Sequence, residues 1–555
     1  MGDFGQMTFE SMPHLLTALV LSPLLGILIL AFIPSSMGQW LKRTAIIASL
    51  LPILIAGYVY ANFNHNAGVM QFVEKFEWTS ISWTNFYGSQ PIPNELHLQY
   101  ALGVDGISLP LVFLTALVAA MAMFASVLIK KRWKLYFILM LILEIGMLGV
   151  FTAQSLTLFF VFFELTLIPM FFLIGIWGLM HREKAANQFL IFNGLGSAIL
   201  FFGIIWIITT AGFTVTGNTM DISADQPVAH FTDFIPTIAD NLNNTDTIAN
   251  ATEWLKPYGL DTTYLLSNST KWTLFILLLV AFGIKLPMFP FHTWMLRVHS
   301  EAPASVVMIH SGILLKMGAY GLLRIGLSFF PEQAQESATW LAILGVVNLL
   351  YGAFCAFAQD ELRSLLAYSS ISHMGIILLG FAANNTIGYS GAVFQMISHG
   401  LISALFFMLV GSLYERTGTT SLSDLGGMSK SLPFISAMML VAGLASLGLP
   451  GLSGFVSELM AFIGLFENHP TLTYIAVLGI ILTAAYVLRG VMNITYGKLA
   501  ISTKMADAQL VEAFPMVVLT AFIILIGVYP SVLSGPLDQS LHEWAHWLNH
   551  TQAGG

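Results

Sequence analysis

Long apolar segments recur along almost the whole chain and decide what it can fold into. About 20 consecutive apolar residues are enough for a helix to cross the hydrocarbon core of a bilayer. Of the 555 residues, 56% are hydrophobic and only 9% are charged, which is too apolar for soluble domains. The sequence therefore predicts an all-α polytopic membrane protein. Its expected spans are 15–33, 44–61, 106–129, 135–153, 156–179, 187–210, 272–294, 304–326, 339–358, 366–383, 389–413, 434–465, 471–496 and 514–533.

The distribution of basic residues supports this set of about fourteen spans. If the loops after odd-numbered spans are cytoplasmic, fourteen of the 21 Lys and Arg residues lie on that side, four lie on the other side and three lie within spans. Basic residues collect in the cytoplasmic loops of membrane proteins. We therefore expect a bacterial inner (plasma) membrane protein with both termini on the outer side.

Composition also excludes several classes of protein. The net charge of −8 gathers in the expected outer loops, which argues against nucleic acid as a partner. The single cysteine, Cys355, excludes a Cys-ligated iron–sulfur cluster or an internal disulfide within this chain. No Gly-rich dinucleotide fingerprint occurs. The loops 62–105 and 211–271 do not read as domains with cores of their own, and the first apolar run reads as a retained span rather than a signal peptide.

Four charged residues lie inside expected spans: Glu164, Lys285, Lys316 and Glu458. A charge near the bilayer centre costs about 2.5–3.5 kcal/mol on insertion scales. Charges without a partner or a task should therefore be rare at such positions. The set indicates a pathway for charge.

Two of the expected spans contain helix-breaking residues. Pro287 lies in the middle of span 272–294, and Pro450 lies beside Gly448 and Gly451 in span 434–465. Proline removes a backbone donor and clashes with the preceding turn, so both helices should be interrupted. The two spans cross in opposite directions, which is typical of an inverted repeat with ion sites at discontinuous helices.

Five motifs in order resemble one membrane-protein family. They are Phe163–Met170, Lys285–Trp294, His299–Pro303, Gly312–Gly321 and Ser372–Gly375. Together they are similar to the antiporter-like membrane subunits of respiratory complex I, the proton-translocating NADH:quinone oxidoreductase. The resemblance covers roughly residues 100 to 530. It implies fourteen helices, two inverted five-helix repeats and proton translocation without a redox centre in this chain.

The resemblance also implies roles for individual residues. Glu164 and Lys285 would form a charge pair, Lys316 would pass the proton towards the centre, and Glu458 would be the terminal site before release. An ion pair in a low dielectric stabilises both charges, so forming or breaking the pair changes proton affinity. The remaining proton-transfer candidates are an accessory carboxylate, Glu144, and three histidines that could bridge the sites through water, His292, His373 and His399.

For each of these residues the alternative is a role in helix packing. His310 stands where the family pattern has an apolar residue and is about 120° around an ideal helix from Lys316, so we predict that it packs. Arg489, inside span 471–496, is left open between packing and function.

Within the family, the glutamate at position 458 matches the M branch (chain 4), because its sister subunits carry lysine there. The implied partners are the antiporter-like subunits L and N and small membrane subunits, together with the lipid bilayer and protons. Flavin, iron–sulfur clusters and quinone are expected in partner chains and none in this one. The alternatives are a subunit of an Mrp-type cation/proton antiporter and one of a membrane-bound hydrogenase.

The spans divide the chain into five expected regions. They are 1–105 with spans 1 and 2 and an outer loop, 106–134 with span 3, 135–326 as the first repeat, 339–496 as the second repeat, and 514–555 with span 14 and an outer tail.

Overall fold

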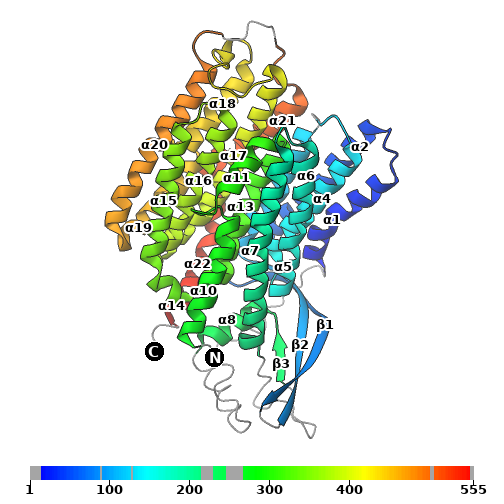
Figure 1. Ribbon diagram of the computed structural model, residues 1–555, viewed down its shortest axis with the longest axis vertical. Helices are drawn as coiled ribbons and strands as arrows, with labels where there is room; N and C mark the ends of the chain where they lie inside the picture. Colours follow the sequence, from blue (N-terminus) through cyan, green and yellow to red (C-terminus); the bar gives the residue numbers. More distant parts are fainter. Residues whose placement is uncertain are drawn as a thin grey trace.

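Long apolar helices run side by side along the long axis of the molecule (Figure 1). The computed structural model describes residues 14–87, 90–126, 129–213, 229–244, 267–499 and 505–550. Among these residues, twelve helical segments are long and apolar enough to cross a membrane, and they coincide with twelve of the expected spans. They are α1 (Leu15–Phe32), α2 (Gly38–Ala61), α3 (Ser108–Ala125), α4 (Trp133–Thr152), α5 with α6 (Leu156–Leu165 and Leu167–Trp177), α7 (Arg182–Ala211), the run α12–η3–α13–η4 (Ala304–Ile309, His310–Leu314, Leu315–Gly321 and Leu322–Leu327), α15 (Ala338–Phe357), α16 (Leu362–Ala382), α17 (Thr386–Thr417), α20 (Pro470–Thr495) and α21 (Leu510–Val528).

The other two expected spans are the interrupted ones. Span 272–294 becomes α10 (Asn268–Lys285) and the first residues of α11 (Thr293–Glu301). Span 434–465 becomes α18 (Pro433–Ser446) and α19 (Ser453–Asn468). Both breaks therefore lie at the prolines that predicted them, and the prediction of discontinuous helices is confirmed.

Neighbouring side chains satisfy backbone groups that the first break releases. The Trp294 indole N–H donates to the carbonyl of Ile284 at 3.1 Å. The Asn348 side chain accepts from the Phe289 N–H at 2.7 Å and donates to the Pro287 carbonyl at 3.4 Å. Unpaired backbone groups are costly at membrane depth, so these contacts stabilise the interruption.

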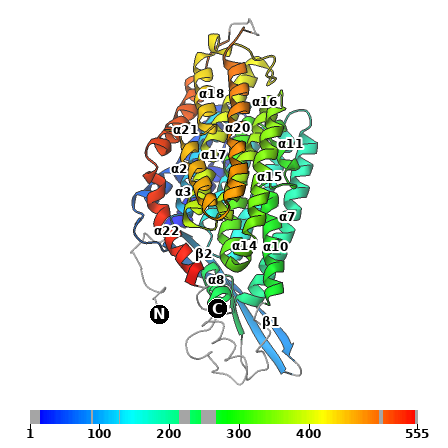
Figure 2. The same ribbon diagram turned by 90° about the vertical axis from the view of Figure 1, so that its left-hand side faces the viewer.

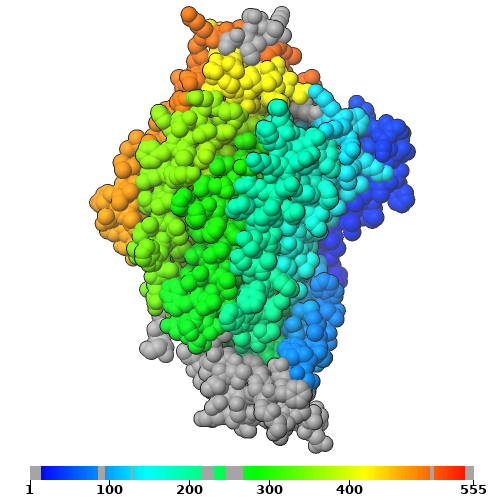
Figure 3. All heavy atoms as spheres, in the orientation of Figure 1, coloured from blue at the N-terminus to red at the C-terminus, as the bar shows by residue number. Residues whose placement is uncertain are grey.

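Two segments form the centre of the bundle. The apolar window of α17 and that of Ala304–Leu327 are both completely buried, whereas α1 and α2 project from one side of the molecule (Figure 3). Helices α4 to α7 lie on one side of this centre, and α15, α16, α18, α19 and α20 lie on the other (Figures 1 and 2). Charged side chains on the central segments are therefore shielded from the lipid by surrounding helices.

A three-stranded sheet extends from one end of the bundle, where the sequence analysis expected a loop. Strands β1 (Gln71–Tyr87) and β2 (Gln90–Val104) form an antiparallel hairpin, and β3 (Ala229–Thr232) adds to β2 in parallel. The sheet is fixed to the bundle through Glu74 of β1, whose carboxylate accepts from the backbone N–H of Leu16, at 2.6 Å, and of Thr17 at the start of α1. A carboxylate is favourable there because the first-turn N–H groups lack helical partners.

A buried ion pair closes the same end of the bundle. Asp105 precedes α3, accepts from the N–H of Ser108 at 2.9 Å and pairs with Arg324. Burial alone would raise the pKa of the Asp105 carboxyl, but Arg324 and the donors at the start of α3 lower it. The carboxylate therefore stays ionised and holds α3 against η4.

The C-terminal part of the chain is also more regular than expected. The predicted outer tail contains α22 (Ser531–His550), in which Leu533, Leu537 and Leu541 are buried. Leucines four residues apart lie on one face of a helix, so the pattern was present in the sequence. The shorter elements are α8 (Ile235–Asn243), α14 (Pro331–Glu336) and η5 (Met428–Lys430).

Candidate functional site

The first predicted pair lies where two helices are interrupted. Glu164 is next to last in α5, which ends at Leu165, and Pro169 cannot donate to the carbonyl of Leu165. Lys285 is the last residue of α10. The two side chains are close enough to interact electrostatically, although no nitrogen–oxygen contact within 4.0 Å joins them among the described residues. Glu164 and Lys285 thus lie near each other, but they form no salt bridge in this structure.

Aromatic rings surround Lys285 in place of a bonded carboxylate. Its ammonium lies 4.8 Å from the ring centroid of Phe163 and 6.0 Å from that of Phe189. Phe189 in turn packs against His310, with 6.0 Å between ring centroids, and Trp294 packs against both rings. A series of aromatic contacts therefore links Lys285 to His310.

His310 forms a buried pair with His299. Nε2 of His299 and Nδ1 of His310 are 2.9 Å apart, and both side chains are fully buried. The second ring nitrogen of each has no protein partner among the described residues. A histidine pair can take up a proton on one nitrogen and give one up from another.

A π-helical turn places Lys316 at the centre. In an α-helix the N–H of Leu315 would bond to the carbonyl of Ser311, four residues earlier. In the turn η3 it bonds instead to the carbonyl of His310, five residues earlier. The Lys316 ammonium donates to the Ser311 carbonyl and lies 2.7 Å from Nδ1 of His399 on α17. Gly312 and Gly400 allow this close crossing, since a Cβ on Gly400 would lie 2.9 Å from the carbonyl oxygen of Gly312.

From His399 the polar contacts continue to the second break. The rings of His399 and His373 have centroids 5.4 Å apart. Nδ1 of His373 lies 3.7 Å from a carboxylate oxygen of Glu458 and 3.1 Å from the side-chain nitrogen of Gln395. Glu458 is on α19, one turn beyond the interruption, and is 6% exposed.

We call this set of neighbouring side chains the buried polar row, in which direct polar contacts alternate with gaps. Its members, in spatial order, are Glu164, Lys285, His310, His299, Lys316, His399, His373 and Glu458. All but Glu164, which is partly exposed, are buried.

Two predicted site residues lie beside the row. Glu144 on α4 is fully buried, and neither carboxylate oxygen has a hydrogen-bond partner among the described residues. His292, between the two halves of the first break, contacts Tyr351 at 3.2 Å and stacks on Phe289. None of the contacts described for these two joins them directly to a member of the row.

Sequence reasoning did not identify the histidine pair. His310 was expected to pack, and it does pack against aromatic rings, but it also bonds to His299 in the gap between Lys285 and Lys316. His299 stood inside a motif without a role. Arg489, left open, pairs with Asp360 at 2.7 Å on an exposed edge and is no member of the row.

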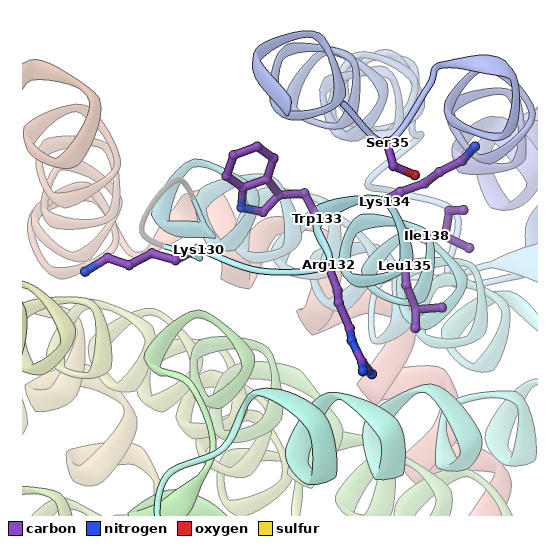
Figure 4. A pocket seen from close by; sticks show the side chains of 7 residues that line it. All are labelled: Ser35, Lys130, Arg132, Trp133, Lys134, Leu135 and Ile138. Carbon is purple, nitrogen blue, oxygen red and sulfur yellow. The ribbon is translucent and has the colours of Figure 1, made fainter. Parts of the chain in front are cut away.

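A basic pocket lies elsewhere on the molecule and holds none of the row residues (Figure 4). It is formed by the segment that leads into α4 and by the first turns of α4, together with Ser35 of the α1–α2 connection. The lining residues are Ser35, Lys130, Arg132, Trp133, Lys134, Leu135 and Ile138. The candidate site is therefore the interior row.

Comparison with known proteins gives consistent relatives over nearly the whole chain. Residues 153–483 match a sequence model described as NADH:quinone oxidoreductase/Mrp antiporter, transmembrane region. The chain is 36% identical over 535 residues to NAD(P)H-quinone oxidoreductase chain 4 of the Mesostigma viride chloroplast, covering 94% of this chain and 95% of that one. It is 36% identical over 541 residues to a chain 4 of Synechococcus elongatus, covering 96% and 91%.

Two solved structures share the fold. A chain of respiratory complex I from Thermus thermophilus superposes with a TM-score of 0.78 at 24% identity, over 96% of this chain and 99% of that one. A chain of the Mrp complex from Dietzia sp. superposes with a TM-score of 0.74 at 19% identity, over 97% and 99%.

Proposed function

The chain belongs to the NADH:quinone oxidoreductase/Mrp antiporter family of membrane subunits, and on that premise we propose that it is the proton-translocating chain 4 of a quinone oxidoreductase. Quinone reduction in other subunits supplies the energy, and the buried polar row carries the proton. The observation that supports this most is the succession of titratable side chains from one helix break to the other, through the fully buried Lys316.

The row supports transfer in one sequence of steps. When Glu164 is near Lys285, the carboxylate stabilises the ammonium and the proton stays. When that attraction weakens, desolvation favours the neutral amine, and the proton moves through His310 and His299 to Lys316.

The second half of the transfer leads to the other break. Lys316 is in contact with His399, which accepts at one ring nitrogen and releases from the other. His373 then passes the proton to Glu458, which releases it, and Lys285 takes up a new proton when Glu164 comes near it again. Gln395, bonded to both His373 and Ser457, positions the imidazole.

Glu144 and His292 serve as accessory proton groups at the sides of the row. Water between side chains would be needed to connect them, as for the histidine pair and Lys316. The burial of Glu144 without a hydrogen-bond partner among the described residues supports a task beyond packing, because an unpaired buried carboxylate is costly.

The proposal extends to the two repeats, the orientation of the termini and the neighbouring subunits. Residues 135–326 and 339–496 form two inverted repeats, each with one broken helix. Both termini face outward, and antiporter-like subunits L and N and small membrane subunits are the neighbours. The exposed apolar residues on α1, including Leu25, Leu28 and Ile29, support contact with lipid or with such a neighbour.

An Mrp-type antiporter subunit is the alternative with structural support, since the Dietzia chain has the same fold. The sequence favours the oxidoreductase, because relatives at 36% identity over 94% and 96% of the chain are chain 4 proteins of NAD(P)H-quinone oxidoreductases. A subunit of a membrane-bound hydrogenase is the further alternative. Oxidoreductase subunits that copurify with the chain would separate these classes.

The experiment uses the assembled complex in sealed vesicles. Lys316→Met keeps the length of the side chain and removes its proton site, so proton uptake per quinone reduced should fall about tenfold or more, which corresponds to about 1.4 kcal/mol of barrier. Lys430→Met is the matched control, because Lys430 is the exposed last residue of η5 and its ammonium bonds only to the Gly497 carbonyl among the described contacts. Proton uptake at the wild-type level in an assembled Lys316→Met complex would contradict the proposal.

A further inference from the structure

The sheet at the end of the bundle brings together side chains that the proton row does not use. Glu95 and His97 lie two residues apart on β2, so they point to the same face of the sheet. His230 of β3 is the register partner of Glu95. One carboxylate and two imidazoles thus meet across two neighbouring strands. The two histidines are 133 residues apart in sequence.

The distances between the donor atoms are those of a metal site. Nε2 of His97 lies 3.1 Å from Nδ1 of His230, and Oε2 of Glu95 lies 3.8 Å from each of them. In a tetrahedral site with metal–ligand bonds of about 2.0–2.1 Å, neighbouring donor atoms are separated by about 3.3–3.4 Å. The observed separations bracket that value, so a single ion could reach all three atoms with shifts of a few tenths of an ångström.

A second carboxylate supports the orientation of one ligand. Glu77 on β1 places Oε1 3.1 Å from Nδ1 of His97. A proton on Nδ1 would then be held by Glu77, and the lone pair of Nε2 would face the other two donors. Metal-bound histidines regularly carry such a carboxylate on the other ring nitrogen.

From this geometry we propose that Glu95, His97 and His230 form a binding site for a divalent transition metal ion of the zinc class, with Glu77 as the positioning carboxylate. Two imidazoles and one carboxylate suit Zn²⁺ and leave a fourth position for water or another ligand. Calcium and magnesium fit poorly, because they prefer oxygen donors. The site is partly open to solvent, with side-chain exposures of 27% for His97, 31% for Glu95 and 35% for His230, so an ion can enter.

Such an ion would fasten β3 to the hairpin. Directly after β3, the backbone of Asp233 accepts from the Leu156 N–H at 2.8 Å, and Ile235 donates to Gln154 at 2.9 Å. These contacts reach the connection between α4 and α5. The metal would therefore stabilise the attachment of the sheet to the end of the bundle, independently of proton transfer.

The test measures bound zinc on the purified, assembled complex, carrying no histidine tag. The complex is stripped with EDTA, dialysed against buffered Zn²⁺ and analysed by elemental mass spectrometry. We expect the wild type to hold one more zinc ion per chain than His97→Asn, His230→Asn or Glu95→Gln, all of which keep side chains of similar size. X-ray absorption of the difference should show two imidazole nitrogens.

Two further variants make the result specific. Glu77→Gln should retain the site but weaken zinc affinity about 10–100-fold. His181→Asn, which changes an exposed histidine between α6 and α7, should leave the zinc content unchanged. Equal zinc in the wild type and the His97→Asn/His230→Asn double variant would overturn the proposal, and so would the same loss in His181→Asn. In either case the two histidines would be only a hydrogen-bonded pair.

Discussion

The two broken helices use one architecture with opposite charges. At the first break, Lys285 ends the half-helix α10, where the negative end of the helix dipole favours a cation. At the second, Glu458 is on the half-helix that starts after the break, and its side chain reaches back towards the positive end, because Cα–Cβ bonds tilt towards the N-terminus. Each interruption thus stabilises the charge that its own sequence supplies.

The surroundings of the two charges differ more than their helices do. Among the described residues, Lys285 has aromatic faces and a nearby carboxylate that makes no contact within 4.0 Å. Glu458 has Nδ1 of His373 at 3.7 Å, and that imidazole is held by Gln395 at Nδ1 and by Ser446 at Nε2. The first site therefore depends on how near its partner comes, whereas the second depends on gaining and losing a proton within a fixed network.

The largest effect is expected at the first break. Glu164→Gln or Lys285→Ala removes half of a pair that controls proton affinity, so proton uptake per quinone reduced should fall about tenfold or more. Assembly should be retained, because replacing Lys285 breaks no side-chain hydrogen bond or ion pair described in the structure, and because Glu164 is partly exposed. The measurement is proton uptake in vesicles normalised to assembled complex, with Glu183→Gln, an exposed glutamate at the start of α7, as the control. Proton uptake at the wild-type rate in the Glu164→Gln complex would contradict the proposal that the first break depends on its charge pair.

At the second break, a graded series is expected. Glu458→Asp keeps a titrating group on a shorter stem and should retain part of the proton uptake, whereas Glu458→Gln keeps the shape and should lose it. Glu458→Lys distinguishes the need for any titratable group from the need for an anion. If the Gln variant transfers protons faster than the Asp variant, Glu458 has a packing role and the row ends elsewhere.

The smallest effect concerns the backbone of the second break. Gly448 and Gly451 both have positive φ, at 77° and 92°, so alanine at either should cost about 1–2 kcal/mol of stability. A Cβ on Gly448 would lie 2.9 Å from Oε2 of Glu458, whereas one on Gly451 meets no atom within 4 Å. Both variants should melt at similar, lower temperatures, but only Gly448→Ala should also slow proton uptake. Equal uptake by the two would show that the break does not position Glu458.

The sequence predicts the membrane-spanning part of the molecule, including both helix breaks, for a physical reason. A bilayer requires long apolar helices, and it makes prolines and charges within them conspicuous. Lys285, Lys316 and Glu458 could therefore be identified without a structure, as could the helix breaks at Pro287 and Pro450.

The remainder depends on contacts between distant segments. His299 and His310 meet only because the chain turns sharply at Ala302 and Pro303, and neither lies on a periodic face that links them. The sheet was overlooked although β1 is rich in aromatic and β-branched residues, because charged residues interrupt the alternation and the third strand comes from residues 229–232. Its Glu95–His230 pairing cannot be read from either strand alone.

The π-helical turn at His310–Leu314 has a consequence for which deletions the central lysine could survive. A π turn contains one more residue than the α-helical turn it replaces, so deleting a single residue there would restore ordinary winding, and the segments on either side would keep about the same orientation. A deletion in the regular winding of α12 has no extra residue to absorb it, and it would rotate Lys316 by about 100° relative to everything before the deletion. The position of a deletion in this helix therefore matters as much as which residue is lost.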